Sequence, residues 1–192
     1  MKMIIYVNRT GKTFYLHQGV TKKGNPKYYF SQKSDGELVD SIPKGFEIYE
    51  NPHAQVFLRR VRPKLITDAE VEIVRSGMDK YSPAKYYQID VKKNIIIIYL
   101  ADQDVDILVE LLESAPGAKG MSVSDIANQF TTYSPMMRFV LVDAERRRFK
   151  VERNCFLGSI DDWVSIGRTD ELPKLVKKYV KHLGQDSYYE LY

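Results

Sequence analysis

The stretch Tyr86–Leu100, with the sequence YYQIDVKKNIIIIYL, decides the fold of this 192-residue chain. Two segments rich in aromatic and β-branched residues, Tyr86–Val91 and Ile95–Leu100, flank the polar turn Lys92-Lys93-Asn94. This arrangement is typical of a β-hairpin. The four consecutive isoleucines at 95–98 put apolar side chains on both faces of the second strand. We therefore expect that strand to be central and covered on both sides.

A second hairpin is expected further along the chain. Met136–Val142 and Arg147–Phe156 are its strands, and Ser159–Ile166 adds a further strand that carries the single tryptophan. Because successive side chains of a strand alternate between its faces, one face of the return strand is apolar and the other is polar. The apolar face holds Phe149, Val151 and Cys155, and the polar face, expected to be wet, holds Arg148, Lys150, Glu152 and Asn154.

Three to four helices accompany these hairpins. Thr67 and Glu70 have the spacing of a capping box, and apolar residues then recur with helical periodicity. A second amphipathic helix covers Val105–Leu112, and a third, short one follows Ser122. The last helix is expected over Leu172–Leu183, with Asp170 as its cap.

The first third of the chain has the pattern of a small antiparallel sheet. Four or five short, tyrosine-rich segments are separated by turn residues. The predicted class is therefore α+β, with a small Tyr-rich antiparallel N-terminal sheet followed by a mixed body of two β-hairpins and three to four helices. We place the boundary near Arg62-Pro63-Lys64, which separates a basic β-rich module, residues 1–62, from an α+β body, residues 63–192.

Composition excludes several classes of protein. No apolar run is long enough to cross a membrane as a helix, and the apolar part of Met1–Tyr6 is too short for a signal peptide. One cysteine, Cys155, excludes internal disulfides and multi-cysteine metal sites, so a reducing cytoplasm is the expected location. Phosphate-loop, dinucleotide-binding and serine-hydrolase motifs are missing, so those kinds of catalysis are unsupported, although a missing motif does not exclude an enzyme. We expect no cofactor.

Charge is distributed unevenly along the chain. The net charge is +4, yet residues 1–65 hold 12 basic and 5 acidic residues, and residues 66–135 hold 6 basic and 11 acidic ones. A basic first third beside an acidic middle indicates two surfaces with different partners, or two parts that attract each other.

The basic first third is the strongest candidate for a binding surface. Cations that neutralise phosphates, interleaved with rings that stack on bases, are what a nucleic-acid surface needs. The residues expected to contact DNA or RNA are Lys12, Tyr15, Lys22, Lys23, Lys27, Tyr29, Arg59, Arg60 and Arg62. The segment Lys12–Gln32, two Tyr-rich strands joined through a basic Gly turn, resembles the small DNA-binding sheets at the start of phage-type integrases, without any diagnostic motif.

Other interpretations of the same residues stay open. Lys, Gly, Asn and Pro also make a soluble hairpin turn, and lysines protect a sheet edge from pairing. The chain could instead be a protein–protein adaptor or a homodimer that uses its acidic middle and aromatic surface. A metal-dependent hydrolase or nuclease would use carboxylates from Asp90, Asp102, Asp104 and Asp106. The leading expectation is a non-enzymatic cytoplasmic protein that binds nucleic acid.

Overall fold

The computed structural model describes residues 3–113, 122, 129–157 and 160–192, and the chain has the α+β class. It divides into two compact units. Unit 1 comprises Met1–Arg62 and Asp106–Thr131, and unit 2 comprises Pro63–Val105 and Thr132–Tyr192. The helix α2, Val105–Glu113, follows the pattern expected for the second amphipathic helix. The short helix expected after Ser122 falls largely outside the described residues.

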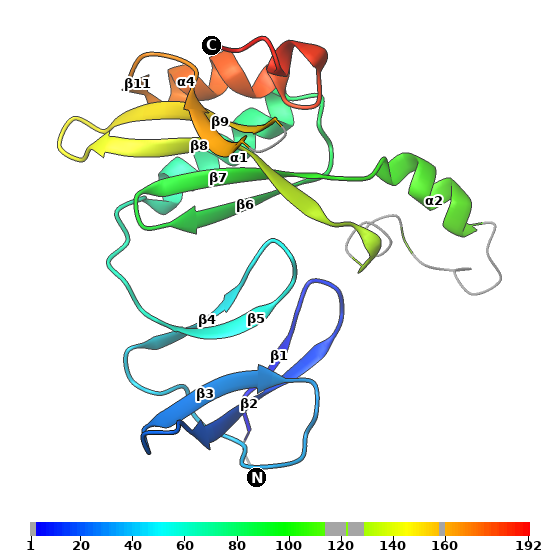
Figure 1. Cartoon of the computed structure of the whole chain (residues 1–192), viewed down its shortest axis with the longest axis vertical. Coiled ribbons are helices and arrows are strands. Elements are labelled where there is room, and N and C mark those ends of the chain that lie inside the picture. The colour runs from blue at the N-terminus through cyan, green and yellow to red at the C-terminus, as the bar shows by residue number, and fades with distance from the viewer. Residues whose placement is uncertain (1–2, 114–121, 123–128, 158–159) are drawn as a thin grey trace. The chain divides into compact units, whose positions relative to one another are not determined.

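Unit 1 contains an antiparallel three-stranded sheet in the order β1-β2-β3. These strands are Ile5–Val7, Thr13–Val20 and Pro26–Ser31. A separate hairpin pairs β4, Phe46–Glu50, with β5, Val56–Arg60. Figure 1 shows both as short, twisted ribbons that follow one another in the chain. The tyrosine-rich segments therefore form strands, as their aromatic content predicts.

One face of this three-stranded sheet supplies the core of unit 1. Leu16 on β2 is fully buried. The ring of Tyr6 lies 6.5 Å from that of Phe30, and the ring of Tyr28 lies 6.0 Å from that of Phe46 on β4. Aromatic contacts thus join this face of the sheet to the β4–β5 hairpin.

Unit 2 is built on a six-stranded antiparallel sheet in the order β10-β9-β8-β7-β6, with the short strand β11 paired to β9. The strands are Tyr87–Lys92 (β6), Ile95–Ala101 (β7), Tyr133–Asp143 (β8), Arg148–Leu157 (β9), Ile160–Ser165 (β10) and Asp170–Glu171 (β11). β7 lies inside the sheet, and both of its faces are buried, as the isoleucine run predicts.

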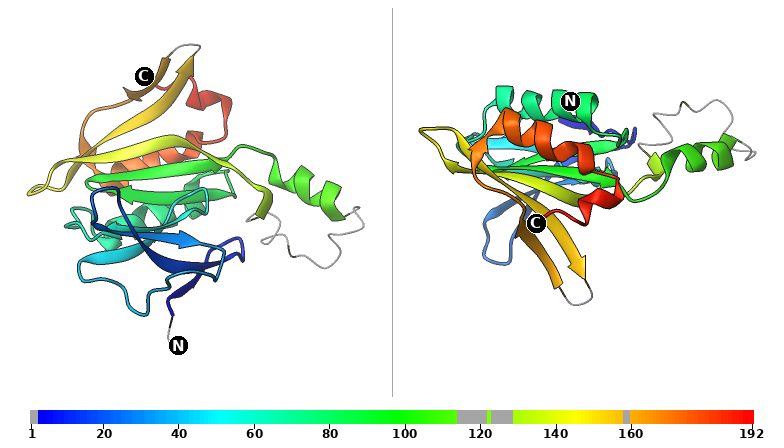
Figure 2. Two further views of the ribbon diagram at one scale, coloured as in Figure 1. Left: turned by 60° about the horizontal axis from the view of Figure 1, so that its bottom comes forward. Right: turned by 90° about the horizontal axis from the view of Figure 1, so that it is seen from above.

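Two helices cover one face of that sheet. They are α1, Asp68–Tyr81, and α4, Leu172–Tyr179, which Figure 2 shows side by side in its right-hand view. Their apolar faces join Ile96, Ile98 and Phe139 of the sheet in one hydrophobic cluster. On α1, Thr67 and Glu70 form the predicted capping box. No helix among the described residues is long and apolar enough to cross a membrane.

The start and end of the last helix differ from expectation. Its N-cap residue is Glu171, because pairing of β11 with β9 keeps Asp170 in an extended strand, where its carboxylate instead lies 2.8 Å from Arg148. The α-helix ends at Tyr179 and continues as the 3₁₀ turn Val180–His182. The apolar stripe stays buried through this change of helix type.

The polar face of β9 also differs from expectation. Glu152 is only 4% exposed, and its carboxylate pairs with Arg138 on β8 and with Lys150. Burial alone would raise the pKa of Glu152, but hydrogen bonds from Lys150 and Arg138 outweigh it and lower the pKa. The guanidinium of Arg138 lies 4.3 Å from the Trp163 ring. Alternation assigns a residue to a face of a sheet, but it does not say what covers that face.

The C-terminal tyrosine segment docks on unit 2. Tyr188, in the 3₁₀ turn Asp186–Tyr188, is 1% exposed and donates its hydroxyl to the carbonyl oxygens of Met136 and Asn154. Burial raises the pKa of Tyr188. Tyr188 therefore holds the C-terminal segment on the body of unit 2.

Candidate nucleic-acid interface

The β2–β3 hairpin presents two of the expected lysines at its tip. Backbone hydrogen bonds close the turn between Thr21 and Asn25, at 2.8 Å, and the Thr21 hydroxyl accepts a second bond from the Asn25 N–H at 3.1 Å. Gly24 has a φ of +80°, which glycine adopts without strain. Lys22 and Lys23 are therefore held at an exposed, well-defined turn.

Tyr29 lies on the other face of the same hairpin, which the loop after β3 covers in part. Its side chain is 45% exposed, and its ring stacks on the His17 ring at a centroid distance of 5.2 Å. His17 is 2% exposed, and its Nε2 lies 2.9 Å from the Lys33 carbonyl oxygen. His17 thus positions the Tyr29 ring, and the loop that follows β3 covers it. The role of His17 is therefore structural.

The strand register decides which side chains share this face. His17 pairs with Tyr29, Tyr15 pairs with Ser31 and Gly19 pairs with Lys27. Directly paired residues point to the same side of a sheet. Tyr15, Tyr29 and Lys27 are therefore on one face, although Tyr15 is only half-exposed. The sequence alone did not predict the pairing of His17 with Tyr29, because pairing depends on register.

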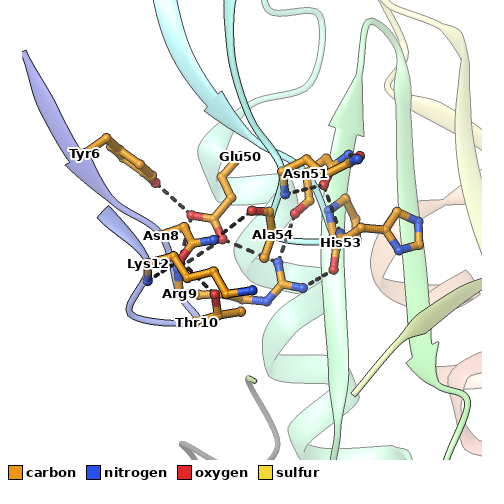
Figure 3. A network of polar contacts seen from close by, with 11 residues as sticks. Tyr6, Asn8, Arg9, Thr10, Lys12, Glu50, Asn51, His53 and Ala54 are labelled. Atoms are coloured by element: carbon orange, nitrogen blue, oxygen red, sulfur yellow. Dashed lines mark hydrogen bonds and ion pairs between the residues drawn. The ribbon is translucent and has the colours of Figure 1, made fainter. Parts of the chain in front are cut away.

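Lys12 lies at the opposite end of β2, in the polar network of Figure 3. Its backbone N–H donates to the Asn8 side chain at 2.9 Å, and that side chain donates to the Ala54 carbonyl at 2.8 Å. Arg9 in the same turn donates to the backbone carbonyls of Asn51 and Pro52. At ~3.3 Å per residue, the eight residues of β2 separate Lys12 from the hairpin tip by roughly 26 Å.

Tyr6 and Glu50 complete this network. The Tyr6 hydroxyl donates to the Glu50 carboxylate at 3.0 Å, and the Arg9 backbone N–H donates to the same carboxylate at 3.1 Å. Burial, followed by the hydrogen bond to Glu50, raises the pKa of Tyr6. The network joins the turn before β2 to the β4–β5 turn and so stabilises unit 1. Its carboxylate, that of Glu50, already accepts hydrogen bonds from Tyr6 and Arg9.

The arginines at the end of β5 do not converge on one surface. Arg59 pairs with Glu47 at 2.8 Å and lies 3.9 Å from the Tyr49 ring. Arg60 points to the other face of the hairpin, where it lies 5.4 Å from the Phe46 ring. Arg62 follows the strand and is exposed. Of the nine expected residues, five lie on the β2–β3 hairpin: Lys22, Lys23, Lys27, Tyr29 and Tyr15.

The carboxylates considered for a metal site lie on β6, directly after β7 and at the start of α2. Asp90 is buried on β6, 3.5 Å from the Lys92 amine. Asp104 directly precedes α2 and Asp106 lies in its first turn, where a helix dipole favours negative charge. In the described part of the chain, no group of three or more His, Cys, Asp or Glu side chains is arranged to hold a metal ion.

Comparison with known proteins adds no relative. No protein-family model, no curated protein and no solved structure matches this chain.

Proposed function

We propose that this protein is a non-enzymatic binding protein that holds nucleic acid on the β2–β3 hairpin. The observation that carries the proposal is the hairpin surface of Lys22, Lys23, Lys27 and Tyr29. All three lysines are exposed, and none has an acidic partner among the described residues. Amines without a carboxylate partner remain available to neutralise phosphates and release counterions.

The Tyr29 ring favours a single strand over a duplex as the ligand. His17 holds the ring in a fixed orientation, so a base that stacks on it restricts little additional side-chain motion. Stacking needs an unpaired base, and it tolerates any base sequence because every base has a π-face. The proposed ligand is therefore single-stranded DNA or RNA, bound with little sequence preference.

The proposal includes a cytoplasmic location. Cys155 is a free, buried cysteine, which needs no oxidising compartment.

The first test is fluorescence anisotropy of labelled single-stranded DNA, single-stranded RNA and duplex DNA at several salt concentrations. We expect micromolar binding to the single strands that weakens steeply with salt. In Lys22→Glu/Lys23→Glu/Lys27→Glu, binding is lost, or the slope of log K against log [salt] falls by about 2 to 3, because up to three phosphate contacts disappear. Tyr29→Ala weakens single-strand binding by about 1–3 kcal/mol and changes duplex binding much less.

The matched control reverses the charge of three exposed lysines in unit 2. Lys80→Glu/Lys177→Glu/Lys181→Glu changes the net charge by the same amount at positions in the other unit, and it should retain binding. An equal loss of binding affinity in both triple variants would mean that net charge, and not the hairpin surface, causes the effect. Absence of binding by the wild type at low salt, or binding insensitive to salt, would refute the proposal and direct attention to a protein partner.

A further inference from the structure

A pocket in unit 2 lies where β10 leads into α4. Its volume is about 360 Å³, near the lower end of the range for small-molecule sites. Its lining includes Ile166, Leu175 and Tyr179, whose side chains are buried. The exposed residues Arg168, Lys174 and Lys178 line it as well. A lining that combines apolar and basic side chains suits a small organic anion.

Tyr179 brings an unpartnered hydroxyl to this pocket. Its side chain is 4% exposed, yet no hydrogen bond joins its hydroxyl to any described residue. The hydroxyl lies against Gly167, where a Cβ atom would come within 2.1 Å of it. The ring is buried, but the hydroxyl oxygen is not among the fully buried polar atoms that lack a partner, so solvent reaches it. The Tyr179 hydroxyl is therefore a donor available to a ligand in the pocket.

The charges around the pocket favour an anion. Asp170 is the acidic residue of the lining, and it already lies 2.8 Å from Arg148 and 3.7 Å from Lys174. Arg168 and Lys178 have no carboxylate partner in the described ranges, and the Lys178 amine lies 4.9 Å from the Tyr179 ring centroid. Two cations and one hydroxyl donor thus remain for a ligand.

We propose that this pocket binds a small phosphate monoester. Its phosphate would be held by the guanidinium of Arg168, the amine of Lys178 and the hydroxyl of Tyr179. A phosphate dianion has several acceptor oxygens in a tetrahedral arrangement, so three donors from different directions can bind it together, and the arginine fork suits it geometrically. The pocket is several times larger than inorganic phosphate, so the organic part of the ester rests on Ile166 and Leu175.

The test uses phenyl phosphate, inorganic phosphate and benzoate as probes of the full chain in a phosphate-free, low-salt buffer. Amide NMR signals of Gly167, Arg168 and Thr169 report binding at the pocket. We expect these signals to shift with phenyl phosphate at millimolar or lower concentration, and more weakly with the other two probes. If inorganic phosphate bound as tightly as phenyl phosphate, the organic part of the ligand would contribute nothing and the proposal of an ester would be wrong. If benzoate bound as tightly, the pocket would not select phosphate over carboxylate and the proposal of a phosphate ligand would be wrong.

Two variants with matched controls locate the contacts. Arg168→Gln/Lys178→Gln should weaken phenyl phosphate binding at least tenfold, and Lys177→Gln/Lys181→Gln, which removes the same charge from α4 and the turn after it, should not. Tyr179→Phe should weaken binding about tenfold without lowering the melting temperature, because the lost hydroxyl has no partner within the chain. Tyr188→Phe should lower the melting temperature and leave phenyl phosphate binding unchanged. Unchanged binding in the Arg168/Lys178 or Tyr179 variants would overturn the proposal.

Discussion

At the residue scale, Glu70 connects local and distant structure. Its side chain accepts the Thr67 backbone N–H at 2.9 Å and so completes the capping box of α1. The same carboxylate pairs with Arg147, which lies 77 residues further along the chain in the turn between β8 and β9. Burial alone would raise the pKa of Glu70, but hydrogen bonds from Arg147 and Thr67 outweigh it and lower the pKa.

This geometry predicts an acid-sensitive contribution to stability. Glu70→Gln should lower the free energy of unfolding at pH 7 by about 2 kcal/mol, since a charge-assisted hydrogen bond is lost. Because the folded-state pKa lies below the unfolded-state value, the advantage of the wild type should be complete above about pH 4.5. It should disappear as the pH falls through the folded-state pKa. Urea denaturation of both proteins between pH 7 and pH 3 measures the difference.

Glu72→Gln on the same helix is the control for this prediction. Glu72 forms an exposed ion pair with Arg75, and such pairs contribute about 0–1 kcal/mol. Its effect should be small at every pH. A difference between wild type and Glu70→Gln that stays constant down to pH 3 would contradict the prediction.

At the element scale, the packing of α1 against α4 depends on a glycine. A Cβ atom at Gly77 would lie 2.1 Å from Cγ1 of Val176. Valine is restricted to one main rotamer in a helix, so its methyl group cannot easily move away. The glycine weakens α1 as an isolated helix but allows the two helices to approach closely.

Gly77→Ala should therefore have opposite effects in two backgrounds. In the wild type it should lower the free energy of unfolding by about 1–2 kcal/mol, because overpacking outweighs the gain in helix propensity. In Val176→Ala it should raise that free energy by about 1 kcal/mol, because the added methyl group enters space left by valine and propensity then dominates. A double-mutant cycle by thermal or urea denaturation tests this, and stabilisation in both backgrounds would refute the steric argument.

At the scale of the whole molecule, the two proposed binding surfaces belong to different units. The hairpin lysines lie in unit 1, whereas Arg168, Lys178 and Tyr179 lie in unit 2. Neither surface uses a residue of the other.

The two binding activities should therefore be separable. Lys22→Glu/Lys23→Glu/Lys27→Glu should lose single-strand binding and still shift the Gly167 amide signal with phenyl phosphate. Arg168→Gln/Lys178→Gln should show the opposite pattern in the same two assays. Loss of both activities in either variant would mean that the sites are coupled or are parts of one larger surface.

Local patterns in the sequence determined the elements of this protein. The isoleucine run at 95–98 specified an interior strand, and the Thr67–Glu70 spacing specified the start of α1. Alternating aromatic residues specified the strands of the N-terminal sheet and placed Lys22 and Lys23 in a turn. These features depend on backbone preference and on side-chain periodicity over a few residues, which are properties of the chain itself.

Tertiary structure alone decided which side chains meet. Pairing of β11 with β9 withdrew Asp170 from the helix cap, and the neighbouring strand supplied Arg138 to the buried Glu152. Strand register set Tyr29 on His17, and the path of the loop before α4 set Gly167 against the Tyr179 hydroxyl. Such contacts join residues separated in sequence, and their partners are chosen by register, helix packing and desolvation, none of which a local pattern encodes.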